Sequence, residues 1–187
     1  MGSTYNINMV HQDIYQKAIL FATAKHHNIG QTVPGTNLPY LVHLSNVAME
    51  IIFAAHNSTD FNTDFAIQLA LLHDTLEDTE TTYEELTQEY SSAVADGVLA
   101  LSKNKSIAKE DRLTDSIERI LLQPKEVWSV KLADRITNLQ PPPSHWTPTK
   151  ISQYHAEAQT ILEKLKGGNQ YLEDRLGLKI QEYKSYF

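Results

Sequence analysis

Four side chains that could bind a metal ion stand within apolar stretches of the sequence. His43 lies in PYLVHLSNV, the pair His73–Asp74 lies in LLHDTLEDT, and Asp134 lies in VKLADRITNL. A buried imidazole or carboxylate is unfavourable unless it is paired. If several helices each point one such group at the same place, a single cation can pair with all of these groups. Two histidines and two aspartates suit a divalent transition metal such as Mn, Fe, Co or Zn. Such a set of N and O ligands, without thiolates, argues against a closed structural zinc site.

Each of these residues also has a simpler explanation. A single histidine on an apolar helix face is more often a hydrogen-bonded core residue than a ligand, and Asp134 could form an ion pair with Arg135 or with a lysine. The joint order of His, His-Asp and Asp on separate predicted helices is much rarer by chance than any of its parts. The joint pattern therefore favours a metal site.

An acidic pair, Glu77–Asp78, follows His73–Asp74 in the same stretch. Residues four apart in a helix lie on one face, so a helix that continues through residue 78 places the pair beside the metal ligands. A divalent ion lowers the pKa of coordinated water, and a neighbouring carboxylate can serve as the general base. We therefore expect Glu77 and Asp78 to be catalytic. The alternative is a solvated helix end that leads into the acidic stretch EDTETTYEE.

Hydrophobic periodicity predicts an all-α fold that positions these groups. The loop GQTVPGTNLP (30–39) and the connector PPPSHWTP (141–148) are rich in the residues that end helices, and no segment alternates long enough to predict a strand. A capping box, Thr82 to Glu85, predicts the start of a short helix. We expect one domain over residues 1–187, with further helices over residues 10–27, 41–56, 63–74, 91–101, 111–122, 127–139 and 148–165, and a last helix after 168.

Composition excludes several classes of protein. The formal net charge is -7, which disfavours loose binding to nucleic acid or to an anionic membrane. No apolar run is long enough to cross a membrane, and the start of the chain does not resemble a signal peptide. The chain has no cysteine, which is compatible with a reducing compartment. We expect a cytoplasmic protein, and the oligomeric state is left open.

The chain resembles a known family in three motifs and in its tail. The H…HD…D order is typical of the HD phosphohydrolase superfamily. LPYLVHLSNVA, ALLHDTLEDT and VWSVKLADRITNL look like the hydrolase domain of the RelA/SpoT alarmone enzymes. The segment from His145 to Leu176 is similar to stand-alone small alarmone hydrolases of the Mesh type. The resemblance implies an HD-type bundle of about eight to ten helices and Mn²⁺ as cofactor. It also implies removal of the 3′-pyrophosphate from (p)ppGpp, without a synthetase activity.

The resemblance also assigns roles to residues. It implies that the four residues named first are the metal ligands and that the acidic pair works on water. Asn138, one turn after Asp134, matches a nucleoside-contacting position. The substrate-binding residues that we expect are Lys25, Asn138, Lys150 and Tyr154. Lys103, Lys131 and Arg135 are further sources of positive charge, although a surface role for the first and a bracing role for the other two are alternatives.

The first loop departs from the family pattern. Alarmone hydrolases of this type carry a basic pair before the PY motif, and its arginine stacks on guanine. Here residues 30–36 read GQTVPGT, without a basic residue. We therefore expect weakened preference for guanine, and Thr32 is where a basic residue would restore it. Adenine alarmones, NADPH and nucleoside monophosphates stay open as substrates. A non-enzymatic nucleotide sensor is a third alternative, against which the acidic pair argues.

Overall fold

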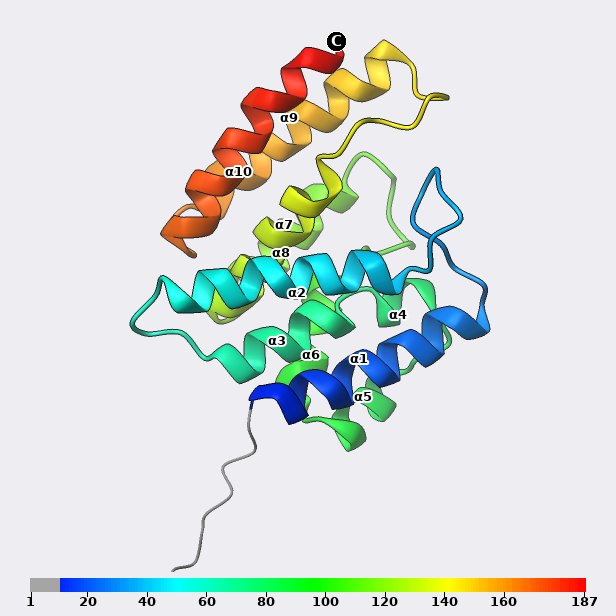
Figure 1. The fold of residues 1–187 in the computed structure, drawn as a ribbon, viewed down its shortest axis with the longest axis vertical. Coiled ribbons are helices and arrows are strands. Elements are labelled where there is room, and N and C mark those ends of the chain that lie inside the picture. Colours follow the sequence, from blue (N-terminus) through cyan, green and yellow to red (C-terminus); the bar gives the residue numbers. More distant parts are fainter. Residues whose placement is uncertain (1–10) are drawn as a thin grey trace, which may run out of the picture.

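Ten α-helices and one short 3-10 helix make up residues 11–187, the part of the chain described by the computed structural model. The all-α prediction is confirmed, and the described residues hold no strand, only an isolated bridge between Thr32 and Pro39. The start of the first predicted helix at Val10 and the N-terminal segment lie outside the described residues. The helices are α1 (His11–Asn28), α2 (Leu41–His56), α3 (Thr63–Leu72), α4 (Thr75–Asp78), α5 (Tyr83–Glu89), α6 (Ser92–Leu101), α7 (Arg112–Leu121), α8 (Lys125–Asn138), α9 (Pro148–Lys164) and α10 (Gln170–Tyr183), followed by Lys184–Tyr186 (Figure 1).

The helix predicted over residues 63–74 ends earlier than expected. α3 stops at Leu72, and the separate short helix α4 begins at Thr75. Two side chains take carbonyl groups that a continuous helix would use: the ring Nδ1 of His73 lies 2.8 Å from the Ala70 oxygen, and the Thr75 hydroxyl donates to the Leu72 oxygen at 2.7 Å. α3 is therefore two residues shorter than predicted, the helix does not continue through residue 78, and the break gives His73 and Asp74 their own orientation.

Side-chain caps fix where several helices begin. In each case an oxygen of the residue before the helix accepts a backbone N–H from its first turn, which stabilises a helix by about 1 kcal/mol. The predicted start at Thr82 is confirmed, since its hydroxyl accepts from the Glu85 N–H. The caps are Asn62 on α3, Thr82 on α5, Ser91 on α6, Thr147 on α9 and Asn169 on α10.

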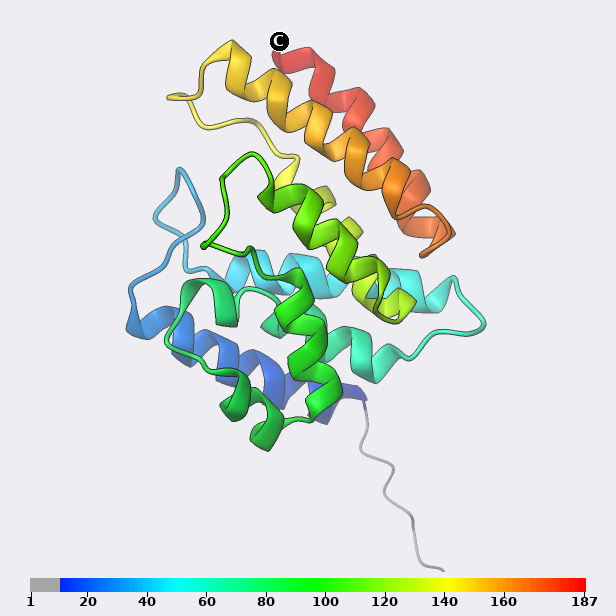
Figure 2. The ribbon, with the colours of Figure 1, turned by 180° about the vertical axis from the view of Figure 1, so that it is seen from behind.

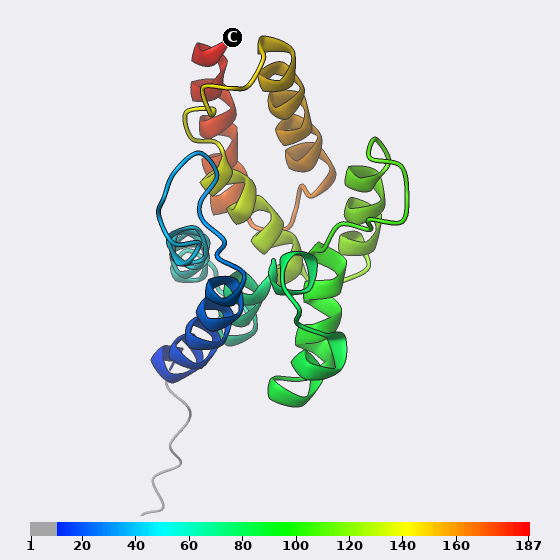
Figure 3. The same cartoon turned by 90° about the vertical axis from the view of Figure 1, so that its right-hand side faces the viewer.

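Helix α8 occupies the middle of the structure. It contacts α2, α3, α6, α7, α9 and α10, and it lies between α2 on one side and α7 on the other (Figures 1 and 3). Its buried apolar residues lie on several faces, which is typical of a helix inside a core; they are Val127, Val130, Leu132, Ala133 and Ile136. Because Asp134 belongs to this helix, its carboxylate is carried into the interior.

The two C-terminal helices form a separate layer above α8. α9 and α10 run side by side in every view, and both contact α8 (Figures 1 and 2). Within residues 11–187, no helix has the length and apolar character needed to cross a membrane.

The close approach of α6 to α3 depends on Gly97. A Cβ added there would lie 2.6 Å from Leu69 Cδ2 and 3.2 Å from Val127 Cγ2, and Leu69 is fully buried. We expect Gly97→Ala to lower the free energy of unfolding by about 1–3 kcal/mol through overpacking, although alanine favours helix. Denaturant unfolding in a chelator measures this.

Gly177 in α10 supplies the matched control for that substitution. The nearest atom to its added Cβ is Leu162 Cδ2 at 3.9 Å, so Gly177→Ala should raise stability by up to about 1 kcal/mol through helix propensity. Equal stabilities for the two variants would mean that α3 and α6 are not in contact at Gly97.

Candidate active site

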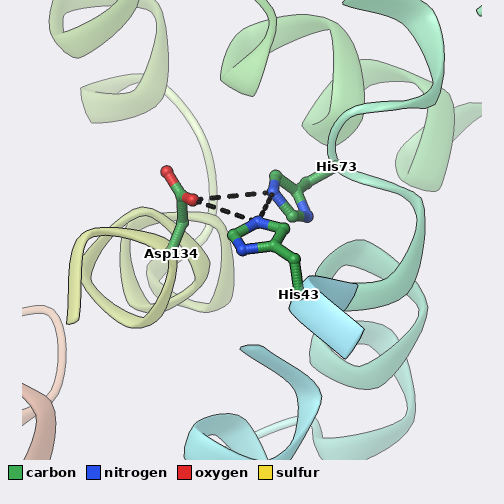
Figure 4. Close-up of side chains that lie close together, drawn as sticks. All are labelled: His43, His73 and Asp134. Carbon is green, nitrogen blue, oxygen red and sulfur yellow. Dashed lines mark hydrogen bonds and ion pairs between the residues drawn. The ribbon is translucent and has the colours of Figure 1, made fainter. Parts of the chain in front are cut away.

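Three of the four predicted metal ligands converge on one point between helices. His43 comes from α2, His73 follows α3, and Asp134 comes from α8; their side chains face one another (Figure 4). One potential ligand atom from each lies within 4.8 Å of the other two. Nε2 of His43 is 3.3 Å from Nε2 of His73 and 3.4 Å from Oδ1 of Asp134, and the second imidazole is 3.8 Å from the same oxygen.

These distances suit a shared cation. Two ligand atoms about 2.1 Å from one ion are separated by about 3.0–3.5 Å at tetrahedral or octahedral angles. The ring Nδ1 of His73 lies 2.8 Å from the Ala70 carbonyl oxygen, so the neutral ring, which is the form that binds a metal, would carry its proton on Nδ1 and offer the Nε2 lone pair to the ion. A backbone carbonyl in this position is a common partner of metal-bound histidine. The donor set is therefore a His/Asp site able to hold a divalent ion.

The fourth predicted ligand, Asp74, lies at the edge of this cluster. Its Oδ2 is 3.0 Å from Nε2 of His73 and 3.7 Å from Nε2 of His43. The same oxygen accepts a hydrogen bond from the hydroxyl of Tyr40. Burial and the neighbouring carboxylate raise the pKa of Tyr40, so its hydroxyl keeps its proton and stays a donor. Its role as a ligand stays a prediction.

Opposite charges compensate one another inside the cluster. Burial alone would lower the pKa of His73, but Asp74 and Asp134 raise it to about 9. Burial alone would raise the pKa of both carboxyl groups; contact with the histidines, and with Lys131 for Asp134, instead holds each below its ordinary value. The cluster therefore favours ionised carboxylates, the form that binds a cation.

The acidic pair lies beside the cluster on α4. Glu77 accepts the backbone N–H of Lys103 at 2.8 Å and its ammonium at 2.9 Å. Asp78 accepts the side-chain amide of Gln31 at 2.9 Å. Both carboxylates line a cavity of about 110 Å³ together with His73, Asp74, Lys103, Lys131 and Asp134. The expectation that Glu77 and Asp78 lie near the ligands agrees with this geometry, although α4 is a separate helix.

A larger cavity of about 480 Å³ adjoins the cluster on the side of His43. Asn138 lines both cavities and donates to Oδ1 of Asp134 at 2.5 Å. The larger cavity has an aromatic and proline-rich wall that suits a planar base; the wall includes Tyr154, Trp146, Tyr183, Pro142 and Pro143. The loop contributes Val33 to Thr36, whereas Thr32 lines a smaller cavity of about 170 Å³.

The other predicted substrate residues are divided between this cavity and the surface. Tyr154 lines the cavity and stacks under Arg135, whose guanidinium carbon is 4.1 Å from the ring centre. The ammonium of Lys150 lies 4.2 Å from the ring centre of Trp146, which lines the cavity, although Lys150 does not line it itself. Lys25 forms an ion pair with Glu85 at 2.6 Å, so a substrate would have to replace that carboxylate. Its role stays a prediction.

Sequence reasoning missed two residues of the site, Tyr40 and Gln31. Tyr40 is buried and donates to Asp74, and its position just before the helix that carries His43 was the signal. Gln31 belongs to the loop that stands out in the sequence for its lack of basic residues. Nothing in the spacing of Gln31 and Asp78 predicts their contact, because it depends on how the loop folds back over α4.

Comparisons with known proteins agree with this geometry. A family model described as an HD domain matches residues 18–169. The chain is 34% identical over 165 residues to a zebrafish (Danio rerio) protein named guanosine-3′,5′-bis(diphosphate) 3′-pyrophosphohydrolase MESH1, covering 86% of this chain and 88% of that one. It is 32% identical over 167 residues to the mouse (Mus musculus) protein of the same name, covering 87% and 90%.

A solved structure has the same fold. It is described as a metazoan ortholog of SpoT that hydrolyses ppGpp and plays a role in starvation responses. The TM-score is 0.77 at 26% sequence identity, with 93% of this chain and 97% of that chain covered.

Proposed function

From the premise that this chain belongs to the HD domain family and, within it, to the family of the MESH1 pyrophosphohydrolases, we propose that it hydrolyses alarmone nucleotides. The reaction is removal of the 3′-pyrophosphate from (p)ppGpp, and from the adenine analogues as well. The observation that carries the proposal is the convergence of His43, His73 and Asp134 next to a carboxylate pair and a nucleotide-sized cavity.

The metal of this proposal is manganese, held by His43, His73, Asp74 and Asp134. The support is an all-nitrogen and oxygen donor set, which suits Mn²⁺ among other divalent ions, together with the family resemblance. When bound, such an ion supplies an activated water and polarises a phosphoryl oxygen.

The protein groups divide the remaining work. Glu77, fixed by two bonds from Lys103, takes the proton of the attacking water, and Asp78 orients that water. Lys103 and Lys131 line the smaller cavity and face the pyrophosphate oxygens. The water oxygen forms a new bond to the phosphorus attached to the 3′ oxygen as the bond between that phosphorus and the 3′ oxygen breaks. Pyrophosphate leaves, and the proton taken up by Glu77 passes to the 3′ oxygen, which restores the 3′-hydroxyl. The nucleoside occupies the larger cavity beside Asn138 and Tyr154, with Lys150 close to its aromatic wall.

A substrate panel with added Mn²⁺ tests this function. We expect release of pyrophosphate from ppGpp, pppGpp and ppApp, measured separately from orthophosphate. The second candidate is a phosphatase that acts on NADPH or nucleoside monophosphates, and the absence of a basic residue in residues 30–36 favours keeping it. Orthophosphate from those compounds, with no pyrophosphate from the alarmones, would establish the second candidate. Nucleotide binding without turnover would indicate a sensor.

Base selectivity follows from the same loop. Stacking of an arginine or aromatic group on a base contributes about 1–3 kcal/mol. Without the arginine, we expect kcat/KM for guanine and adenine alarmones to differ by less than about 100-fold. Val33 lines the 480 Å³ cavity and its neighbour Thr32 lines the separate 170 Å³ cavity, so Val33→Arg should shift the ratio towards guanine.

Thr32→Arg adds the same charge one residue away and is the matched control. Its ratio should stay near that of the wild type, which revises the expectation that Thr32 is the position to change. A wild-type enzyme that rejects adenine substrates would show that another part of the cavity reads the base.

We also propose which molecules the enzyme binds and where it is located. Its partner is a small nucleotide, with no nucleic acid and no membrane. A cytoplasmic location and a single domain over residues 1–187 stay predictions.

A further inference from the structure

A chain of side chains runs from α1 through the first loop to the acidic pair. The ring Nδ1 of His26, on α1, lies 2.5 Å from Oε1 of Gln31. The amide nitrogen of the same glutamine donates to Oδ2 of Asp78 at 2.9 Å. His26 is 1% exposed, so this series of hydrogen bonds starts from a side chain that the core holds in place.

The carboxylate at one end of this chain determines the direction of both bonds. Asp78 is an acceptor, so the Gln31 amide must turn its NH₂ group towards Asp78 and its oxygen towards His26. The imidazole must then carry a proton on Nδ1 to donate to that oxygen. Each of the three groups thereby has one compatible orientation.

The surroundings of His26 support the same tautomer. Burial lowers the pKa of His26, which favours the neutral ring. Its Nε2 is buried and has no hydrogen-bond partner among the described residues. A proton on Nε2 would leave a buried donor without an acceptor, which is the less favourable alternative. The single proton of the ring is therefore assigned to Nδ1.

Backbone hydrogen bonds of the loop hold Gln31 in place between His26 and Asp78. Its N–H donates to the His26 carbonyl at 3.0 Å, and its carbonyl accepts the N–H of Tyr40 at 3.3 Å. The rings of His26 and Tyr40 are in contact, with centroids 4.7 Å apart, and Tyr40 in turn donates to Asp74. The loop that lacks the family's basic pair thus supports the two aspartates of the site from one side.

We propose that Gln31, oriented by His26, is a positioning residue that holds the Asp78 carboxylate in its place for catalysis. This assignment rests on the proposed function, since Asp78 is assigned there to orient water. Gln31 lines the smaller, 170 Å³ cavity and not the 480 Å³ cavity that suits the nucleoside. It therefore acts through Asp78 and does not contact the base.

Kinetics of Gln31→Leu test the role. The variant keeps the size of the side chain and removes both hydrogen bonds. We expect kcat to fall about 10-fold, equivalent to about 1.4 kcal/mol, with KM and metal content within about twofold of the wild type. Asn37→Leu is the matched control, because Asn37 is an exposed amide of the same loop, and its kcat should not change.

A double-mutant cycle separates positioning from a merely structural role. If Gln31 acts through Asp78, adding Gln31→Leu to Asp78→Asn should lower kcat no further. Full additivity of the two effects would overturn the proposal, as would a change in KM alone. His26→Asn retains a donor near the place of Nδ1 and should recover part of the kcat that His26→Leu loses; equal losses would also contradict it.

A spectroscopic measurement does not depend on turnover. Nitrogen-15 shifts of the histidine rings in metal-free protein should show His26 as the Nδ1–H tautomer, and Gln31→Leu should change that signal. An Nε2–H tautomer in the wild type would overturn the hydrogen-bond chain. If the wild type hydrolyses no nucleotide while the Nδ1–H tautomer is present, the proposed function has failed and the arrangement of His26 and Gln31 has not.

Discussion

Replacement of His73 by alanine is expected to strip the protein of its metal and to end hydrolysis. The imidazole is 3% exposed, its Nε2 faces the shared point of the cluster, and its other nitrogen is committed to the Ala70 carbonyl. Loss of a group that only hydrogen-bonds to a metal ligand already lowers metal affinity by about 10–100-fold. Loss of the ligand itself should therefore lower metal affinity by more than about 100-fold. Elemental analysis after dialysis against Mn²⁺, together with kcat/KM, measures both effects.

The same substitution should destabilise the protein even in a chelator. His73 lies 3.0 Å from Oδ2 of Asp74 and 3.8 Å from Oδ1 of Asp134. Removing one member of a buried ion pair leaves the other uncompensated and lowers stability by about 3–5 kcal/mol. His56→Ala is the control, because His56 is an exposed histidine at the end of α2. Full metal content and activity in His73→Ala would show that the ligand assignment is wrong.

The convergence of His43, His73 and Asp134 could be predicted because each one stands within an apolar stretch of the sequence. The apolar neighbours of His43 and Asp134 require both side chains to point into the core, where a charged or polar group needs a partner. The structure brings those two residues and His73 within reach of one ion. The helix bounds followed from the same periodicity, and α2 begins and ends where it was predicted.

What could not be predicted depends on competition between local and long-range contacts. The break between α3 and α4 arises because His73 and Thr75 bond to backbone carbonyls, an outcome that periodicity does not contain. The pairing of Lys25 with Glu85 depends on how α1 faces α5. The fold of the loop also decides that Thr32 and Val33 line different cavities. The Lys25–Glu85 contact joins segments 60 residues apart in the sequence, which periodicity does not bring together.

Neutral replacements of the acidic pair should separate catalysis from metal binding. Glu77→Gln and Asp78→Asn keep the shape of each side chain and remove its charge. A general base contributes about 10²–10⁴-fold to the rate, and that is the loss in kcat that we expect from Glu77→Gln. The variant weakens an ion pair between Lys103, whose side chain is 55% exposed, and Glu77, whose side chain is 10% exposed. Because glutamine can still accept the backbone N–H of Lys103, we expect the variant to stay folded.

Asp78→Asn should lower kcat as well, since it weakens the hydrogen bond from Gln31 and alters the group proposed to orient water. Metal content of both variants should match that of the wild type, which distinguishes them from His73→Ala. Glu80→Gln is the matched control, because Glu80 is exposed and lies two residues after the end of the same short helix. If Glu77→Gln and Asp78→Asn both turn over substrate as fast as Glu80→Gln, the acidic pair is only a helix end. Another group that lines the 110 Å³ cavity would then have to take the proton of the attacking water.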